Sequence, residues 1–333
     1  MNETVSQTRT GDYLVRARDL NVAFVSREAT VNAVNGIDLD LAFGEVLCIL
    51  GESGSGKSVT LRALMRLNPK GKTVMSGELS VAGHDMMALP DSMLTSVRGR
   101  EVSMIFQEPM TALDPVFTIG RQIGETIVRH EGISRREAEQ RALDLLELVQ
   151  IPSAKRRLSA YPHELSGGLR QRAMIAMAIS CRPKLLLADE PTTALDATVQ
   201  IQILLLLRRL QQELGMGVIF VTHDLGVAGE IADRIAVMYA GRMVEQASVT
   251  DFITRPLHPY AQGLMGATVH SGMRGHRLTT IPGSPPDLRL PISGCAFAAR
   301  CPHVVNACRA ALPPFRHPEP GRAVRCVRFE EAA

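Results

Sequence analysis

The octapeptide GESGSGKS at residues 51–58 is the feature that most constrains this chain. It follows the apolar run EVLCILG (45–51), typical of a buried parallel strand, and opens the helical pattern KSVTLRALMRL (57–67). Between a strand and a helix, G-x-x-x-x-G-K-S is the pattern of a phosphate-binding loop, because backbone N–H groups and the helix N-terminus surround phosphate oxygens. An ordinary glycine-rich turn does not account for the complete pattern in this context.

This loop is therefore predicted to bind a nucleotide. Lys57 adds a positive charge, and the hydroxyl of Ser58 can ligate Mg²⁺. The residues expected to contact the nucleotide here are Gly51, Glu52, Ser53, Gly54, Ser55, Gly56, Lys57, Ser58 and Val59.

Two further apolar runs, KLLLADEP (184–191) and GVIFVTHD (217–224), also read as strands of a parallel sheet and end in polar residues. The first places Asp189 and Glu190 at its tip, where one carboxylate can hold Mg²⁺ through water and the other can polarise an attacking water. An acidic pair alone is more often a solvated strand end, but beside a phosphate-binding loop it indicates nucleotide hydrolysis. A lone histidine is usually structural, yet His223 ends a strand near the others, where it could hydrogen-bond the γ-phosphate.

Helical patterns lie between these strands, at 135–151, 169–179 and 199–214, so we expect an α/β core with an inserted helical region. The composition changes near residue 255, because eleven of the nineteen prolines lie from Pro256 onward. We place the start of a C-terminal extension near 260. No internal repeat is visible, which predicts one catalytic core per chain.

Composition excludes some classes of protein. A net charge of +3 with 21 % charged residues is too small to indicate a nucleic-acid partner. The N-terminus lacks the basic-then-apolar pattern of a secretory signal, and the longest aliphatic runs, such as ILLLL (203–207), are too short to cross a bilayer. We therefore expect a cytosolic protein that can dock on a membrane.

A second glycine-rich helix start is present in LSGGLRQR (165–172). A serine and two glycines at a helix N-terminus form another anion site. Because one chain with one phosphate-binding loop cannot easily place both sites on the same γ-phosphate, we expect this site to serve the nucleotide of a partner.

Together these residues resemble the nucleotide-binding subunits of ABC transporters, whose signature LSGGQ is matched here except that Leu169 replaces glutamine. By this resemblance Phe24 stacks on adenine, and Gln107 in FQEPMTALDP (106–115) is the glutamine of the Q-loop. Asp196 in TTALDAT (192–198) belongs to the D-loop. The resemblance also implies three catalytic side chains: the base Glu190, the switch histidine His223, and Gln107.

The resemblance further implies a fold and an assembly. The fold is the α/β P-loop NTPase (RecA-like) nucleotide-binding domain, covering 1–260, with an inserted helical subdomain at about 107–180 that docks on a coupling helix of a membrane subunit. Two such subunits sandwich two ATP molecules head to tail, so that Ser166, Gly167 and Gly168 contact the ATP of the partner. The expected Mg²⁺ ligands are Ser58, Gln107 and Asp189.

The C-terminal extension, 261–333, contains four of the six cysteines, with the spacing C-x5-C-x6-C-x17-C. The spacing matches no simple zinc pattern, and it leaves open whether the thiols bind Zn²⁺, an iron–sulfur cluster or nothing. Together with RPLHPYAQGLM (255–265) and IPGSPPDL (281–288), the tail is similar to that of dipeptide and oligopeptide importer ATPases. Since several of these carry a [4Fe–4S] cluster here, the resemblance implies a cluster on Cys295, Cys301, Cys308 and Cys326.

The resemblance thus implies an ATPase subunit that energises import of dipeptides and oligopeptides, peripherally bound at the cytoplasmic face of the inner membrane. Its partners would be a second, homologous ATPase subunit, two transmembrane permease subunits and an extracytoplasmic peptide-binding protein. One alternative is the same role for nickel or another metal chelate. A second is a non-transport ABC ATPase acting on DNA or ribosomes, but the long coiled coils, zinc-bearing insertions or paired cassettes typical of such proteins do not appear.

Overall fold

The computed structural model describes residues 13–108, 112–193, 195–267 and 280–329. Its centre is a seven-stranded sheet in the order β11-β10-β9-β3-β8-β7-β6. The five strands β9, β3, β8, β7 and β6 are parallel. At one edge of the sheet, β10 pairs antiparallel with β9 and β11 pairs antiparallel with β10. Their bounds are β3 Val46–Leu50, β6 Val102–Ile105, β7 Leu185–Asp189, β8 Gly217–Thr222, β9 Arg234–Tyr239, β10 Arg242–Ser248 and β11 Ala323–Val324.

The three apolar runs predicted as parallel strands are confirmed as β3, β7 and β8. They are neighbours, because β8 pairs in parallel with both β3 and β7. The carboxyl ends of parallel neighbours meet at one edge of the sheet, so the polar residues after these strands lie on the same side of the molecule.

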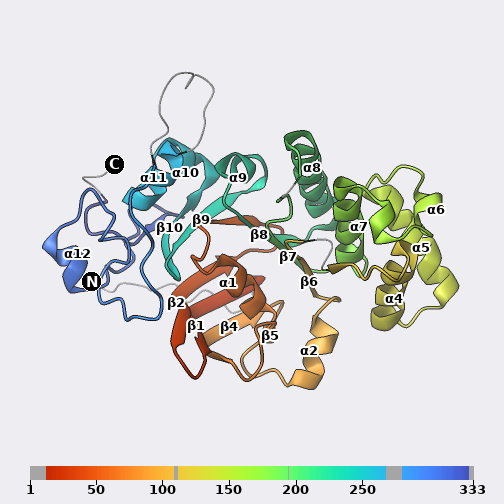
Figure 1. Cartoon of the computed structure of the whole chain (residues 1–333), viewed down its shortest axis with the longest axis horizontal. Coiled ribbons are helices and arrows are strands. Elements are labelled where there is room, and N and C mark those ends of the chain that lie inside the picture. The colour runs from red at the N-terminus through yellow and green to blue at the C-terminus, as the bar shows by residue number, and fades with distance from the viewer. Residues whose placement is uncertain (1–12, 109–111, 194, 268–279, 330–333) are drawn as a thin grey trace, which may run out of the picture.

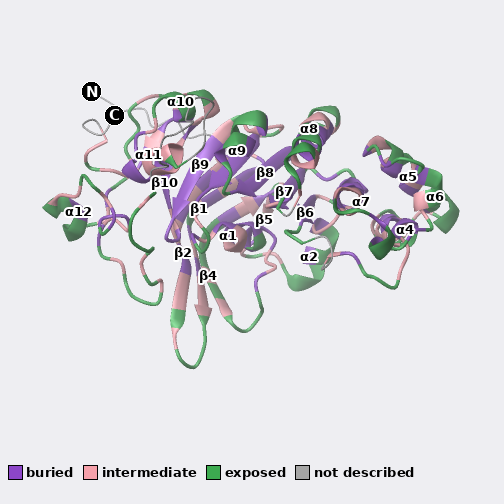
Figure 2. Cartoon of the chain, turned by 45° about the horizontal axis from the view of Figure 1, so that its top comes forward, coloured by how far each residue is buried: buried purple, intermediate pink, exposed green. Residues whose placement is uncertain are grey.

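A second sheet, of four antiparallel strands, has the order β2-β1-β4-β5 and was not predicted from the sequence. The side chains of β1 alternate between buried and more exposed positions over much of its length, as expected for a sheet with one face on the core. Figure 2 shows the exposed tip of the hairpin formed by β1 and β2 extending away from the rest of the protein. The bounds are β1 Val15–Val25, β2 Thr30–Leu41, β4 Thr73–Val81 and β5 His84–Asp85.

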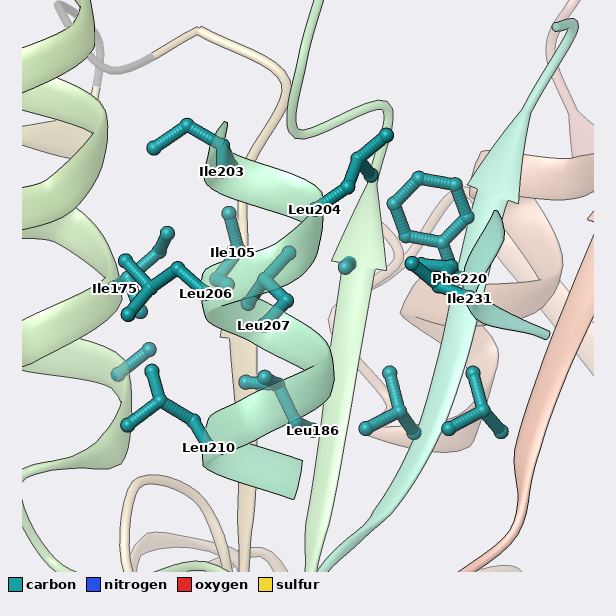
Figure 3. Close-up of a cluster of buried hydrophobic side chains, with 14 of the residues drawn as sticks. Ile105, Ile175, Leu186, Ile203, Leu204, Leu206, Leu207, Leu210, Phe220 and Ile231 are labelled. Carbon is teal, nitrogen blue, oxygen red and sulfur yellow. The ribbon is translucent and has the colours of Figure 1, made fainter. Parts of the chain in front are cut away.

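Strand β3 separates two hydrophobic cores. Val46, Cys48 and Leu50 pack with the helices α7, α8 and α9, whereas Leu47 and Ile49 pack with α1 and the four-stranded sheet. Figure 3 shows side chains of α8 gathered against Ile175 of α7 and Leu186 of β7. The helices are α1 Lys57–Leu64, α7 Gly167–Ile179, α8 Ala197–Leu214 and α9 Leu225–Ile231, and α1, α7 and α8 confirm the helices predicted in these regions.

A group of helices lies between β6 and β7 and forms one end of the molecule (Figure 1). Local signals explain its boundaries: Thr118 caps α4, and Ser134 and Glu137 form a capping box on α5, the helix predicted at 135–151. Gly132 ends α4 with a left-handed φ of 71°. The bounds are α4 Ile119–Glu131, α5 Arg135–Leu148, α6 Ala154–Arg157 and the short 3₁₀ helix η1 Pro162–Glu164, while α2 Asp91–Val97 precedes β6.

The C-terminal segment packs at the opposite end (Figure 1). Strand β11 extends the main sheet by pairing with β10. The fully buried Arg322 lies 3.6 Å from the buried carboxylate of Glu245 and donates to the carbonyl of Arg255. The helices here are α10 Val249–Thr254, α11 Pro259–Gly266 and α12 Asn306–Ala310. Across the part of the chain that the structure describes, no helix is long and apolar enough to span a membrane.

Candidate active site

The loop 51–56 leads from β3 into α1 and depends on its glycines. A Cβ added to Gly51 would lie 2.2 Å from the carbonyl oxygen of Met238, and one added to Gly56 would lie 2.4 Å from that of Ala33. Gly56 also has a φ of +102°, which side chains disfavour. Only glycine therefore lets the loop pass this close to the neighbouring backbone.

Lys57 lies inside the loop, 5 % exposed. Its Nζ donates to the carbonyl oxygens of Gly51 and Glu52, at 2.7 and 2.9 Å. Burial lowers the pKa of Lys57, and the nearby carboxylates of Glu190 and Asp189 oppose this shift. A phosphate oxygen can replace the loop carbonyls as the acceptor of the Lys57 ammonium group. Its negative charge would then balance the positive charge of the ammonium.

The other loop residues present several polar groups. Ser53 and Gly54 are exposed, whereas Ser55 is buried. The Oγ atom of Ser55 has no hydrogen-bond partner in the described part of the chain. The side chain of Val59 packs against the core formed with the four-stranded sheet. These features fit a bound nucleotide.

Ser58 joins this loop to the end of β7. Its Oγ donates to Oδ1 of Asp189 at 2.7 Å, and Asp189 is only 1 % exposed. Burial raises the pKa of the Asp189 carboxyl, and the hydrogen bond from Ser58 opposes that shift. A hydroxyl and a carboxylate in contact offer the oxygen ligands that Mg²⁺ prefers.

Several polar side chains converge on one oxygen of Glu190, the residue after β7. Oε2 of Glu190 accepts from Oγ1 of Thr193 at 2.9 Å and from Nε2 of Gln107 at 3.3 Å, and Nδ1 of His223 lies 3.4 Å away. The structure thus brings together the three residues predicted to be catalytic. Thr193 was not predicted, and the only signal was its place in the polar stretch that follows Glu190.

Glu190 also has an unusual backbone conformation, with a φ of 45°. A left-handed conformation at a residue with a side chain costs about 1–3 kcal/mol, and such strain is concentrated at functional sites. The backbone N–H of Glu190 donates to the carbonyl oxygen of Val221 in β8 at 3.0 Å, which holds this turn against the sheet.

The second glycine-rich helix start lies at the beginning of α7. Oγ of Ser166 accepts from the N–H of Leu169 at 3.4 Å and caps the helix. A Cβ on Gly168 would lie 2.7 Å from Cγ1 of Val199, so this glycine allows α7 to approach the first turn of α8. Asp196 caps α8 by accepting from the N–H of Val199 at 3.0 Å.

Ser166, Gly167, Gly168 and Asp196 therefore lie on the neighbouring N-termini of two helices. In Figure 1, α7, whose N-terminus carries Ser166, Gly167 and Gly168, is separated from α1, which follows the loop 51–58 of the same chain. Phe24 lies in β1, partly exposed, between Val31 of β2 and Thr73 of β4. Residues 109–111 of the predicted Q-loop segment and residue 194 of the predicted D-loop segment lie outside the described residues.

The four cysteines of the C-terminal segment line one small cavity of about 10 Å³, together with His258 and Phe297. The N–H of Cys295 donates to the carbonyl oxygen of Cys308 at 2.7 Å. Burial raises the pKa of Cys295 to about 11, and the neighbouring thiol groups add to the shift. All six cysteines are free. Within the described ranges, no three or more His, Cys, Asp or Glu side chains are arranged to hold a metal ion, although the fold brings the four thiols to one place.

A loop with these contacts between a parallel strand and a helix, with an acidic pair at the end of a nearby strand, defines a P-loop ATPase fold. Residues 34–193 match the family described as ABC transporter, and residues 244–308 match the one described as oligopeptide/dipeptide transporter, C-terminal region. The chain belongs to the family of ABC transporter ATP-binding proteins, and it is an ATPase. The resemblance noted from the sequence is thus confirmed.

Relatives of known sequence and structure agree with this assignment. The chain is 50 % identical, over 96 % of both chains, to "Probable peptide ABC transporter ATP-binding protein y4tR" of Sinorhizobium fredii. It is 45 % identical, over 98 % of both, to the oligopeptide transport ATP-binding protein OppD of Salmonella typhimurium. A dimeric ATP-binding cassette in a post-hydrolysis state, bound to ADP and Pi, superposes with a TM-score of 0.63 at 30 % identity, covering 71 % of this chain and 98 % of that one.

Proposed function

We propose that this ATPase energises an ABC importer of dipeptides and oligopeptides and acts peripherally at the cytoplasmic face of the cell membrane. The observation that carries the ATPase part is the convergence of Gln107, Thr193 and His223 on the carboxylate of Glu190, beside the contact between Ser58 and Asp189. The peptide cargo is supported by the match of residues 244–308 and by the names of the relatives.

In this proposal each group at the carboxyl edge of the sheet has a separate role. The backbone N–H groups of residues 51–58 and the ammonium of Lys57 bind the phosphates, and Phe24 stacks on the adenine ring. Ser58, Gln107 and Asp189 would hold Mg²⁺, which neutralises charge on the β- and γ-phosphates when bound.

Glu190 would act as the general base. Its Oε2 accepts the proton of the attacking water, while His223 hydrogen-bonds the γ-phosphate. The hydroxyl of Thr193 holds the Glu190 carboxylate in place at 2.9 Å. The left-handed backbone of Glu190, with its φ of 45°, supports this role because such strain is concentrated at functional sites.

The proposed assembly places the signature of one chain on the ATP of another. Ser166, Gly167, Gly168 and Asp196 would contact ATP held by the loop of a second, homologous ATPase subunit, since these residues lie on exposed helix N-termini away from the loop of their own chain. Two transmembrane permease subunits and an extracytoplasmic peptide-binding protein complete the complex. No nucleic acid takes part.

We also propose how the chain is divided. Residues 1–260 form the ATPase domain, in which the helices α4 to α7 belong to a helical subdomain at about 107–180 that contacts a permease subunit. Residues 261–333 form the extension typical of peptide importers. The group of helices between β6 and β7 and the cysteine-lined cavity at the opposite end support this division.

Cys295, Cys301, Cys308 and Cys326 would hold a [4Fe–4S] cluster with a structural role. Support comes from their common cavity and from their chemistry, because soft thiolate ligands select iron–sulfur clusters and zinc. Burial raises the pKa values of Cys301 and Cys326 as well, so these thiols are protonated at neutral pH and ligation has to release their protons.

Anaerobic preparation tests the cluster. We expect bound iron and a broad absorbance near about 400 nm, as is usual for such clusters, both lost in Cys301→Ser and retained in Cys181→Ser, which alters a buried cysteine of the ATPase core. Zinc without iron would replace the cluster by a zinc site. A preparation with neither metal would refute the proposal.

The function is tested by uptake in cells whose own copy carries Lys57→Ala. Labelled dipeptides and oligopeptides are supplied, with nickel as a parallel tracer. We expect peptide uptake to be lost and nickel uptake to be unchanged. Loss of nickel uptake alone would assign a metal-chelate importer instead, and unchanged uptake of both would contradict the importer role.

A further inference from the structure

Glu52, the second residue of the phosphate-binding loop, is fixed by residues that lie more than 200 positions away in the chain. Its backbone N–H donates to the hydroxyl of Tyr260 at 2.9 Å. Its carboxylate forms a two-pronged contact with the guanidinium of Arg300, at 2.8 and 3.1 Å. Its carbonyl oxygen accepts from Lys57. Two of the three anchors therefore come from α11 and from the cysteine-bearing segment that follows it.

Arg300 is held in place from several directions. Its side chain is 5 % exposed, and it donates to the backbone carbonyls of Pro282 and Ile281 at 2.8 and 3.1 Å and to the hydroxyl of Tyr239 at 3.2 Å. The guanidinium of Arg300 binds both carboxylate oxygens of Glu52. Arginine is suited to this two-pronged contact and lysine is not, because the N–H donors of a guanidinium form a planar fork. This contact therefore joins the cysteine-bearing segment firmly to the phosphate-binding loop.

The same segment carries the cysteine cavity. Arg300 directly precedes Cys301, and its N–H donates to the carbonyl oxygen of Phe297 at 2.9 Å. The ring of Phe297 lines the cavity and lies 5.3 Å from the ring of Tyr239 and 5.4 Å from that of Tyr260. The rings of Phe297 and Tyr260 thus lie in sequence between the thiols and the phosphate-binding loop.

The negative charge of Glu52 explains why the phosphate-binding loop needs its contact with Arg300. A nucleotide brings several negative charges to the loop, and a free carboxylate at its second position would repel them. Arg300 neutralises the Glu52 carboxylate, and a carboxylate left half-buried without its partner is costly. We propose that Arg300 is a positioning residue of the ATP site, and that the cysteine-bearing segment and the phosphate-binding loop stabilise each other through the contact between Arg300 and Glu52. This inference rests on the ATP site proposed above.

Nucleotide binding by the purified full-length protein tests it, with the fluorescent analogue mant-ATP and Mg²⁺ as the probe. We expect Arg300→Gln to weaken binding about tenfold, within the 5–150-fold range of typical couplings between sites, and to raise KM for ATP with little change in kcat. The double variant Glu52→Gln/Arg300→Gln should bind more tightly than Arg300→Gln, because the repelling charge is gone. Arg289→Gln, which removes an exposed arginine paired with Asp287 in the same segment, is the matched control and should bind normally.

Hydrogen exchange provides a second measurement that does not require Arg300 to be altered. By reciprocity, bound nucleotide should slow exchange of the amides of residues 295–301 in the unaltered protein. Glu52→Gln, which leaves the C-terminal segment intact, should abolish this protection.

The outcomes separate this inference from the site on which it rests. If Lys57→Ala loses nucleotide binding while Arg300→Gln binds like the unaltered protein, the ATP site stands and the role of Arg300 is refuted. A double variant that binds no better than Arg300→Gln refutes the charge argument, and protection of 295–301 that persists in Glu52→Gln refutes the coupling. If Lys57→Ala binds normally, the site itself is wrong, and this inference with it.

Discussion

Replacing Ser58 by alanine removes a single hydroxyl at the junction between the phosphate-binding loop and the end of β7. That hydroxyl donates the 2.7 Å hydrogen bond to Asp189, whose side chain is 1 % exposed. A hydrogen bond to a charged group contributes about 1.5–3 kcal/mol to the free energy of unfolding, and removing the donor from a buried carboxylate costs about that amount. We therefore expect Ser58→Ala to lower the free energy of unfolding by about 1.5–3 kcal/mol at pH 7 without Mg²⁺.

The loss should depend on pH. Because burial raises the pKa of Asp189, the stability that this group contributes is largest while the carboxyl is protonated, and it is lost as the pH rises through the folded-state pKa. Without the hydroxyl that pKa rises further, so the difference between variant and unaltered protein is largest at neutral pH. At lower pH, as the carboxyl takes up its proton, the difference should shrink toward about 1 kcal/mol, the contribution of a neutral hydrogen bond.

Urea denaturation in EDTA at pH 7 and pH 5 measures the difference. Ser96→Ala is the control, because it removes an exposed hydroxyl in α2 that donates to the carbonyl of Met93, and it should change stability by less than about 0.5 kcal/mol. In Mg²⁺, Ser58→Ala should also weaken binding of mant-ATP, with no change when Mg²⁺ is absent. Equal stability at pH 7 together with an unchanged Mg²⁺ dependence would refute the link between Ser58, Asp189 and the metal.

Three further substitutions test the packing that supports the site, each by urea denaturation. Gly56→Ala places a Cβ 2.4 Å from the Ala33 carbonyl at a φ of +102°, so it should cost about 2 kcal/mol or more and remove nucleotide binding; normal binding would contradict the described loop. Gly168→Ala places a Cβ 2.7 Å from Cγ1 of Val199 and should lower the free energy of unfolding by about 1–3 kcal/mol. An unchanged stability would show that α7 and α8 can move apart at no cost. Leu207→Ala, at 3 % exposure, should cost about 2–5 kcal/mol and leave KM for ATP unchanged, and a change in KM would connect this core to the site.

The strands that carry the site could be predicted from sequence because each is a short run of buried apolar residues with polar residues at its end. The four-stranded sheet gave a weaker signal. The alternation in β1 is interrupted around Asp19, where φ is 45° and the register with β2 shifts between Ala17 and Leu20. Such irregularities break the period of two on which a strand prediction depends.

The proximity of motif residues could likewise be predicted, because the structure brings the side chains of Gln107 and His223 to one oxygen of Glu190. Arg300 could not be predicted, because its contact with Glu52 joins positions 248 residues apart and exists only once the C-terminal segment has folded onto the core. Thr193 was missed for a different reason. A threonine in a polar turn has no distinctive pattern, and its role depends on the backbone conformation of Glu190.

ATP hydrolysis by the assembled complex, compared with that of a complex carrying Glu190→Gln, tests the central claim most directly. Glutamine keeps the shape of the side chain but cannot accept a proton, so hydrolysis should fall by about 10²- to 10⁴-fold, the usual contribution of a general base, while mant-ATP binds as tightly as before. A Glu190→Gln variant that hydrolyses ATP at a rate close to that of the unaltered protein would contradict the assignment of Glu190 as the base and, with it, the mechanism built on this site.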